Sequence, residues 1–213
     1  MFKKLFAAVL TVSVFGFAGA ASAQEAADAF IKRISQEVLE TAKTDKDIQQ
    51  GNQQKILEVV QAKILPNVDF QRMTSLAAGR HWREATPEQQ KRLTDEFRDL
   101  LVYTYAGAIA SIRDQQLEFK PMRNDPADTD VEVRSQVVQQ RGEPIQLNYR
   151  LSKAGNSWKI YDLNVLGAWL VETYKGNFAS EISKGGIDGL IKTLAERNKR
   201  LASGGIVKTA KPS

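Results

Sequence analysis

The chain carries few side chains that could act as nucleophiles, imidazole bases or metal ligands. It contains no cysteine, and its single histidine is His81. Thiol catalysis, thiolate metal sites and most histidine-based hydrolase mechanisms therefore lack their reactive group. His81 lies in the basic and aromatic segment Arg80-His81-Trp82-Arg83. This segment could serve surface docking, but a loop anchored by Trp82 is the simpler interpretation.

Asp162 is the main candidate for acid–base chemistry. It lies in a segment whose apolar and polar residues alternate. If the register of the strand turns its carboxyl inward, burial would raise the pKa of Asp162 and make it a general base. A tyrosine such as Tyr105 could then be the matching acid. The alternative is a carboxylate that faces solvent or bonds a neighbouring strand, as Asn164 on the same face could also do.

The longest apolar pattern of the chain runs through residues 158–174. It alternates like a strand but is longer than a buried strand needs. The odd positions from 161 are free of charge and form this series: Tyr161, Leu163, Val165, Gly167, Trp169 and Val171. Alternation places them on one face, which favours contact with a long apolar ligand. Trp158 and Ile160 are even-numbered, so either a bulge flips the register near Ile160 or both faces are covered there.

Amphipathic helices must come before this strand. Apolar residues at intervals of three and four predict helices over residues 25–41, 52–64, 69–78 and 87–113. Thr86 and Gln89 form the pattern of a capping box, with Pro87 at the first helical position. Gly107 costs roughly 1 kcal/mol within a helix relative to alanine. Its presence indicates close packing of helix on sheet or room for a ligand chain beside the helix.

Beyond residue 114 the apolar period changes from helical to two. The alternation predicts strands over residues 117–119, 131–137 and 145–151, before the long segment, and helices over residues 172–183 and 188–201 after it. Short connections between the strands predict an antiparallel meander. Helices before and after such a sheet predict an α+β fold in which helices cover one face, as one domain over residues 24–202.

The start of the chain resembles an export signal. Two lysines precede an apolar run over residues 5–17, and Ala21-Ser22-Ala23 has the form cut by signal peptidase. We therefore expect a signal peptide over residues 1–23 with cleavage after Ala23. No later segment approaches the length of a membrane span, so we expect a soluble, exported protein, most simply a bacterial periplasmic one. Residues 203–213 are expected to be a disordered tail.

Charge argues against nucleic acid as a partner. Cleavage would leave 190 residues, which is 213 minus 23, and would reduce Lys and Arg from 30 to 28 against 25 Asp and Glu. A net charge of +3, which is 28 minus 25, gives no concentrated basic footprint. The last helix does end in a basic group: Lys192, Arg197, Lys199 and Arg200. These cations suit a helix C-terminus, and they could also attract an anionic membrane or an acidic partner.

The whole mature chain resembles the periplasmic phospholipid-binding MlaC family, also called the toluene-tolerance family. The resemblance rests on Tyr161-Asp162 with Val165-Leu166-Gly167, on the run over residues 184–190, and on the Tyr-, Ala- and Gly-rich residues 97–110. It implies an NTF2-like or cystatin-like curved sheet, wrapped by helices around an apolar lipid pocket. It also implies that phospholipid is bound as cargo, with no catalytic residue, cofactor or metal. The implied partners are an outer-membrane lipoprotein complex and an inner-membrane ABC transporter with an MCE-domain subunit.

Apolar side chains that could share one interior between helix and sheet are the candidates for lipid contact. The predicted lining comprises Leu101, Tyr105, Ile109, Val133, Val137, Leu147, Tyr149, Leu163, Val165, Trp169, Val171 and Tyr174. Two other functions remain open. One is an NTF2-like enzyme that uses an inward Asp162 with Tyr105, and the other is a ligand-free periplasmic adaptor with a filled core.

Overall fold

The computed structural model describes residues 25–122, 125, 127–139 and 142–204. The predicted signal peptide and its cleavage site lie outside the described residues, as does nearly all of the predicted tail. Among the helices of the described part, none has both the length and the apolar character needed to cross a membrane. The assignment of residues 24–202 to one domain stays a prediction.

Helices form the first half of the chain, and each predicted helix is present, although some end earlier than expected. Their bounds are α1 Ala27–Thr44, α2 Lys46–Gln49, α3 Gln53–Val59, α4 Phe70–Ala78 and α5 Pro87–Tyr105. At the start of α5, the backbone N–H of Gln89 donates to the Thr86 hydroxyl, and the Thr86 N–H donates to the Gln89 side chain. The predicted capping box is therefore present and begins helix α5.

Two of these helices change their winding at their ends. Helix α3 continues into the π-helical turn η1, Val60–Ile64, and then the 3-10 turn η2, Leu65–Asn67. Helix α5 ends at Tyr105 and continues as the 3-10 turn η4, Ala106–Ser111. The expectation of one α-helix to residue 113 is therefore wrong in its last part. Gly107 has a weak preference for the α-helix, which lowers the cost of leaving α-helical winding there.

Five strands form one antiparallel sheet in chain order, which confirms the predicted meander. Their bounds are β1 Gln116–Phe119, β2 Asp130–Val138, β3 Ile145–Ala154, β4 Ser157–Val165 and β5 Ala168–Trp169. The two central pairs extend furthest: Val133 lies opposite Tyr149 in β2 and β3, and Tyr149 lies opposite Leu163 in β4. These directly opposed residues share one face of the sheet.

A β-bulge flips the register of β4 near Ile160, which is the first of the two alternatives that the sequence left open. Arg150 pairs with Asp162 and Leu151 pairs with Ile160, so Tyr161 is the extra residue. The bulge explains why the apolar positions are even before it and odd after it.

The prediction of one continuous apolar strand face through Val171 is wrong. Strand β4 ends at Val165, because Leu166 and Gly167 have φ angles of 55° and 87° and reverse the chain. Positive φ at both positions is the geometry of a two-residue hairpin turn. The short β5 then returns along β4, with Ala168 opposite Val165.

Helix α6, Leu170–Ser203, follows directly and carries one interruption. Gly186, with φ 66° and ψ −169°, is non-helical, so two helical segments meet there at a kink. This confirms the predicted pair of helices, although the break is narrower than expected. The first segment also begins at Leu170, two residues before the predicted start.

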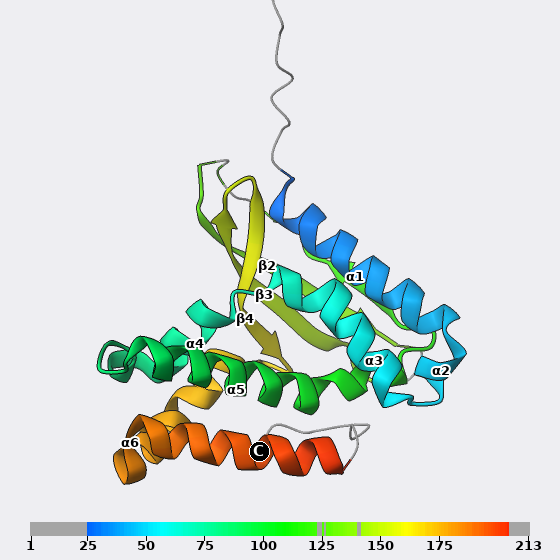
Figure 1. The fold of residues 1–213 in the computed structure, drawn as a ribbon. Coiled ribbons are helices and arrows are strands. Elements are labelled where there is room, and N and C mark those ends of the chain that lie inside the picture. The colour runs from blue at the N-terminus through cyan, green and yellow to red at the C-terminus, as the bar shows by residue number, and fades with distance from the viewer. Residues whose placement is uncertain (1–24, 123–124, 126, 140–141, 205–213) are drawn as a thin grey trace, which may run out of the picture.

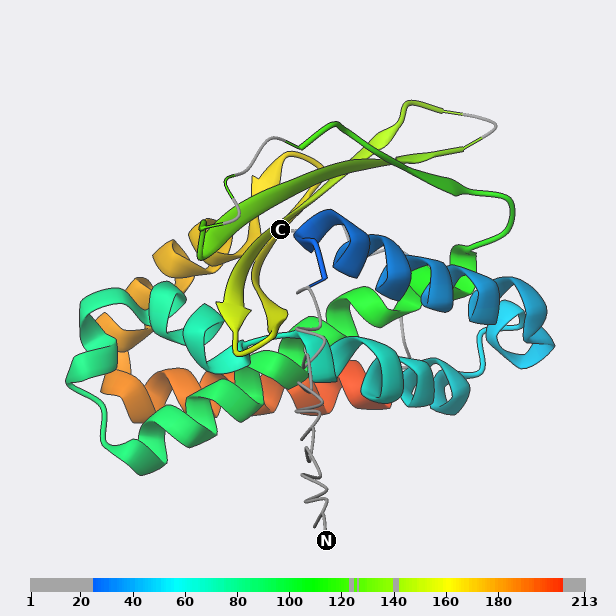
Figure 2. The same ribbon diagram turned by 90° about the horizontal axis from the view of Figure 1, so that it is seen from above.

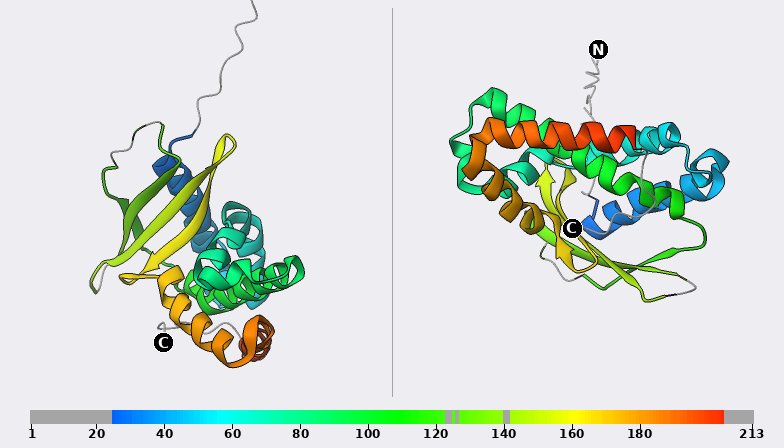
Figure 3. Two further views of the ribbon diagram at one scale, coloured as in Figure 1. Left: turned by 90° about the vertical axis from the view of Figure 1, so that its left-hand side faces the viewer. Right: turned by 90° about the horizontal axis from the view of Figure 1, so that it is seen from below.

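The sheet is curved, and the helices lie on its concave side. Figure 1 shows α1, α3 and α5 in front of the strands, with α6 along the lower edge. Figure 2 shows the sheet as an arch with α1 beneath it. Both views of Figure 3 show the same division into a curved sheet and a helical layer. The structure is the predicted α+β fold with helices on one face.

Candidate ligand-binding site

Buried apolar side chains form three separate clusters. The helical cluster joins α4, α5 and α6, where the Phe97 ring lies 4.9 Å from the ring centroids of both Tyr174 and Phe178. The sheet cluster packs Phe30 and Ile31 of α1 against the concave face. The third cluster joins α2, α3, η1 and η4. The half-buried Val68 and Leu163 pack against both the helical and the sheet cluster and so join these two.

Half-buried apolar side chains lie between the clusters. Those packed against a cluster include Ile64, Leu65, Val68, Val102, Tyr105, Leu147 and Leu163. These apolar side chains are only partly covered, which makes them candidates for contact with an apolar ligand.

The concave face of the sheet is covered unevenly. Near the first turns of α1, Val133 and Tyr149 are buried. Towards the β4–β5 turn, Leu147 and Val165 lie opposite each other on the same face but remain half-buried. Helix α1 therefore closes one half of the face, and the other half keeps accessible apolar surface.

The predicted lining residues are spread over these environments. Leu101, Val171 and Tyr174 are buried in the helical cluster, Val133 and Tyr149 in the sheet cluster and Ile109 in the third cluster. Tyr105, Val137, Leu147, Leu163 and Val165 are half-buried. Ile64, Leu65 and Val102 were missed, although Ile64 continues the helical stripe through Ile56 and Val60. Contact of any of these residues with a ligand stays a prediction.

Trp169 corrects the predicted face. It pairs with Asn164, and the Arg150 guanidinium lies 3.9 Å from the centroid of its ring. Asn164 and Arg150 both belong to the convex face, opposite Leu163 and Val165. The expectation that Trp169 shares the face of Leu163 and Val165 is therefore wrong, because the two-residue turn reverses the alternation.

Asp162 is buried, with 1% of its surface exposed, and its oxygens are occupied. Oδ1 accepts the backbone N–H of Val171 at 3.0 Å and of Leu163 at 2.9 Å, and Oδ2 accepts from Arg150 at 3.2 Å. Burial raises the pKa of Asp162, while the two amides and Arg150 favour its charged form. The bond to Arg150 confirms the predicted link to a neighbouring strand. Through its bond to the Val171 N–H, the carboxylate anchors the start of α6.

The tyrosines of the interior hold their protons strongly. Burial raises the pKa of Tyr105 to about 12, and it raises the pKa of Tyr149 to about 12 as well. Hydrogen bonds with Ser35 and Ser135 act in the opposite direction on Tyr149. Among the described residues, the hydrogen bonds of Asp162 do not include Tyr105. The acid and base of the enzyme hypothesis, Tyr105 and Asp162, are therefore not hydrogen-bonded to each other.

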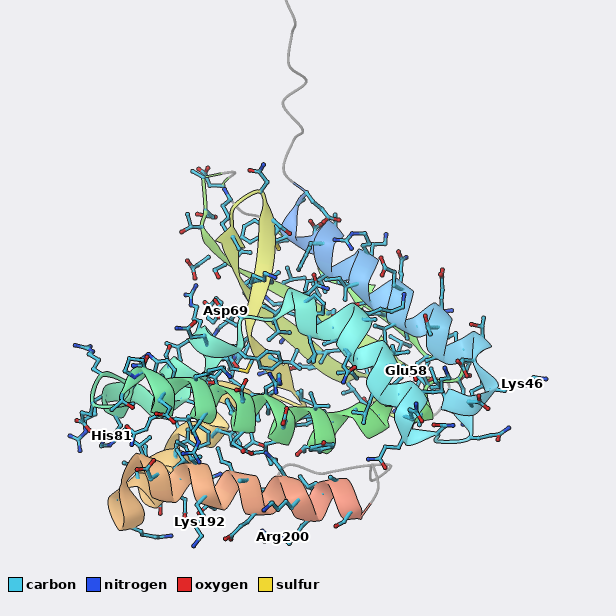
Figure 4. The ribbon with its side chains drawn as sticks, viewed as in Figure 1. Lys46, Glu58, Asp69, His81, Lys192 and Arg200 are labelled. Carbon is cyan, nitrogen blue, oxygen red and sulfur yellow. The ribbon has the colours of Figure 1, made fainter. Side chains whose placement is uncertain are left out.

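His81 lies far from the sheet. Its Nδ1 is 2.8 Å from a carboxylate oxygen of Glu84, and Trp82 packs against the helical cluster. Figure 4 shows His81 at the opposite end of the molecule from Lys46. The segment is the 3-10 turn η3, Gly79–Arg83, and not the expected loop, but Trp82 does anchor it on the helical cluster. In the described part of the chain, no cluster of His, Cys, Asp and Glu side chains could hold a metal ion.

The chain is similar to proteins that bind phospholipid. A family model described as "MlaC protein" matches residues 32–196. The intermembrane phospholipid transport system binding protein MlaC of Haemophilus influenzae is 27% identical over 157 residues, which cover 69% of this chain and 73% of that protein. Toluene tolerance protein ttg2D of Pseudomonas putida is 24% identical over 165 residues, which cover 77% and 76% respectively.

A solved structure extends this similarity to the fold. It is the phospholipid-binding protein from Ralstonia solanacearum in complex with a phospholipid, with a TM-score of 0.79 and 50% sequence identity. The match covers 84% of this chain and 99% of the Ralstonia chain.

Proposed function

The chain belongs to the MlaC family, and we propose from this premise that it is a phospholipid carrier. The observation that carries the proposal is the match, at 50% identity, to a phospholipid-binding protein whose structure contains a phospholipid. The three separate clusters, with half-buried apolar side chains between them, support it independently. A carrier needs an interior that can accept apolar chains, whereas an adaptor would have a filled core.

In this proposal the acyl chains insert between the three clusters, which move apart to receive them. The lining of the space that opens is formed by the half-buried apolar residues that face the concave side of the sheet or the clusters beside it: Leu65, Val102, Tyr105, Leu147, Leu163 and Val165. The buried residues of the earlier list, such as Val133 and Tyr149, form the wall behind them. Trp169 is not part of this lining, since it stacks on Arg150 on the convex face.

The energetic requirement on this interior is large. Each methylene removed from a bilayer must regain about 0.8 kcal/mol of hydrophobic free energy in the protein. Two chains of roughly 15 carbons therefore require on the order of 20–25 kcal/mol. Only continuous apolar contact along both chains supplies this amount. The proposal thus requires the clusters to separate slightly around the lipid while each keeps its own packing.

No chemical step on the lipid is needed. The lipid is moved unchanged, and its charged headgroup can remain near water, which avoids the cost of burying a charge. Asp162 accepts a hydrogen bond from the Val171 N–H at the start of α6. The pKa values of Tyr105 and Tyr149, about 12, keep both hydroxyls protonated. These features suit a binding protein. We further propose that the protein is exported to the periplasm. There it exchanges lipid with an outer-membrane lipoprotein complex and with an inner-membrane ABC transporter that has an MCE-domain subunit.

Native mass spectrometry of the purified full chain tests this function. We expect a mass increment that matches diacyl phospholipid, and extraction of the protein should release lipid phosphorus in a constant ratio to protein. Delipidated protein should regain the increment after incubation with phospholipid vesicles. Protein that carries no lipid and takes none from vesicles would refute the carrier function and favour the adaptor.

A further inference from the structure

Arg197 of α6 is half-buried and has no partner among the described residues. The other half-buried arginines in that part of the chain are Arg72, Arg98 and Arg150, and each of them pairs with a carboxylate. A guanidinium that loses part of its water without gaining a partner costs free energy. A ligand with acceptor atoms at Arg197 would remove this cost.

The stripe of α6 that carries Arg197 faces the helical cluster. Leu194, three residues before it, is buried in this cluster, and Leu201, four residues after it, packs against the same cluster. Residues at these intervals share one face of a helix, so Arg197 stands between the two leucines. The next residue, Asn198, donates to the backbone oxygen of Glu96 at 2.9 Å, which holds α6 beside α5 at this level.

Two tyrosines lie at the same level of the helical layer. The ring centroid of Phe97, which follows Glu96 in α5, is 4.9 Å from that of Tyr174. Tyr105 lies about two turns further along the same face of α5, and its side chain leans back towards Phe97, as long side chains in helices do. Burial raises the pKa of both tyrosines, and the positive charge of Arg197 acts in the opposite direction on each. The guanidinium is therefore near both phenols.

The hydroxyls of Tyr105 and Tyr174 make no hydrogen bond within the described part of the chain. Tyr174 is only 7% exposed, and Tyr105 is half-buried. The fully buried side-chain atoms that lack a partner there are Thr104 Oγ1 and Asn198 Oδ1. The two phenol oxygens are not among them, so each reaches accessible space and can donate to a ligand.

These three side chains together offer donors to an anion. The carboxylate of Glu96 accepts from Asn198 Nδ2 at 2.8 Å and does not pair with Arg197. The planar guanidinium of arginine matches the oxygens of a phosphate, and its charge strengthens the hydrogen bonds. Hydroxyl donors beside it can reach the remaining oxygens. The set therefore fits a phosphate group better than a neutral or cationic ligand.

We propose that Arg197, Tyr105 and Tyr174 bind the phosphate group of the cargo phospholipid. This inference rests on the proposed carrier function. Tyr105 also belongs to the proposed lining, so a phosphate at its hydroxyl leaves the acyl chains beside its ring. Arg197 stays partly exposed, which allows the rest of the headgroup to remain in water. Because every phospholipid carries this phosphate, the site holds the lipid without selecting the headgroup.

A comparison of lipids with and without phosphate tests the chemistry. Phosphatidylethanolamine and a diacylglycerol with the same chains are offered in equal amounts, dispersed with cyclodextrin, to the delipidated protein, and mass spectrometry counts the bound lipids. Arg197→Gln should lower the ratio of bound phospholipid to diacylglycerol about tenfold, through loss of a charge-assisted hydrogen bond. Arg200→Gln is the matched control, because it removes the same charge from an exposed position of α6 and should leave the ratio unchanged.

Variants that keep the aromatic ring test the hydroxyls. Tyr105→Phe and Tyr174→Phe should each lower the same ratio about threefold, less than the arginine variant, because a neutral donor is lost. Tyr103→Phe is the control, since Tyr103 is also a half-buried tyrosine of α5 but lies on a different face from Phe97 and Tyr105. An equal effect in Tyr103→Phe would mean a general loss of packing and would overturn the role of the hydroxyls.

The outcomes separate the phosphate site from the carrier function. A ratio that falls in Arg197→Gln but not in Arg200→Gln supports the site. Ratios that are unchanged, or that change equally in both variants, overturn the site while the carrier function stands. Calorimetric titration with inorganic phosphate distinguishes a free anion: phosphate binding that depends on Arg197, with an unchanged lipid ratio, overturns the assignment to lipid. Wild-type protein that binds neither lipid refutes the carrier function itself.

Discussion

Asp162 connects three parts of the fold through one side chain. Its oxygens accept hydrogen bonds from Val171 at the start of α6, from Leu163 in its own strand and from Arg150 in β3. Arg150 in turn lies over Trp169 of β5. The carboxylate therefore fixes the direction in which α6 leaves the sheet, and α6 supplies much of the helical cluster.

Removal of this acceptor should destabilise the protein. Asp162→Ala leaves the buried N–H groups of Val171 and Leu163 without partners, and we expect a loss of about 2–4 kcal/mol in the free energy of unfolding. Asp162→Asn keeps an oxygen for both amides and should cost markedly less. Denaturant unfolding of the two variants measures the difference. In an enzyme with Asp162 as base, Asp162→Asn would abolish activity, whereas lipid loading should remain close to wild type.

The pKa of Asp162 gives a pH test. Because burial raises this pKa above the unfolded value of about 3.9, the folded state binds the proton more tightly. The resulting stabilisation is complete below about pH 4 and is lost as the pH rises through the folded pKa. We therefore expect wild type to lose stability relative to Asp162→Asn as the pH rises from 4. A relative gain over that interval would mean that Arg150 and the amides dominate.

At the scale of elements, the bulge at Tyr161 and the turn at Leu166-Gly167 decide which residues of β4 and β5 face the helices. The bulge keeps Ile160 and Leu163 on the concave face despite their opposite parity. The turn then places Trp169 on the convex face. Leu163 and Val165 are therefore the part of the long apolar pattern that can line a ligand space.

A charge at Val165 tests that lining. Val165→Glu should reduce lipid loading about tenfold or more, because a carboxylate beside acyl chains loses its solvation. The domain should stay folded, because Val165 is only half-buried. Val138→Glu, on the opposite face of β2, is the matched control and should load normally. Loading and circular dichroism of both variants decide the case. Val171 is less suitable, since it is buried in the helical cluster and a glutamate there would disturb folding.

The kink in α6 depends on glycine. At Gly186 the backbone has φ 66° and ψ −169°, a region that essentially only glycine occupies. An added Cβ would meet no atom within 4 Å, so the cost of Gly186→Ala is backbone strain, about 1–3 kcal/mol. Gly189→Ala, also without a neighbour within 4 Å, lies in regular helix and should be neutral or stabilising. Thermal unfolding compares the two. Equal effects would mean that the kink straightens at little cost.

At the scale of the whole molecule, the division of the core should couple stability to ligand. A ligand that fills the space between the clusters binds only the folded state and stabilises it by about 2.7 kcal/mol at a free concentration 100 times Kd. Delipidated protein should therefore melt roughly 5–10 °C lower than loaded protein. Calorimetry of both forms measures this shift. Equal melting temperatures would favour a core that is already filled.

Local patterns in the sequence predicted most elements. The helical stripes, the capping box at Thr86 and the strand alternation depend on residues close in sequence, so they can be read without tertiary contacts. The α+β fold and the meander followed from them, while the family was identified by its resemblance in residues 97–110, 161–167 and 184–190. The signal peptide and the lining residues stay predictions.

Other features depended on contacts between distant segments. The reversal at Leu166, a non-glycine residue with positive φ, is stabilised by pairing of β5 with β4, and its side chain preference gave no warning. Burial of Asp162 depends on Arg150, 12 residues away, and on the first turn of α6. Periodicity shows which face of its helix or strand an apolar side chain occupies, but not which cluster that side chain joins. The sequence by itself therefore determined most of the helices, the order of the four longer strands and the resemblance to the family. Only the tertiary structure decided which face Trp169 occupies and how the core is divided, because both depend on packing between elements far apart in the chain.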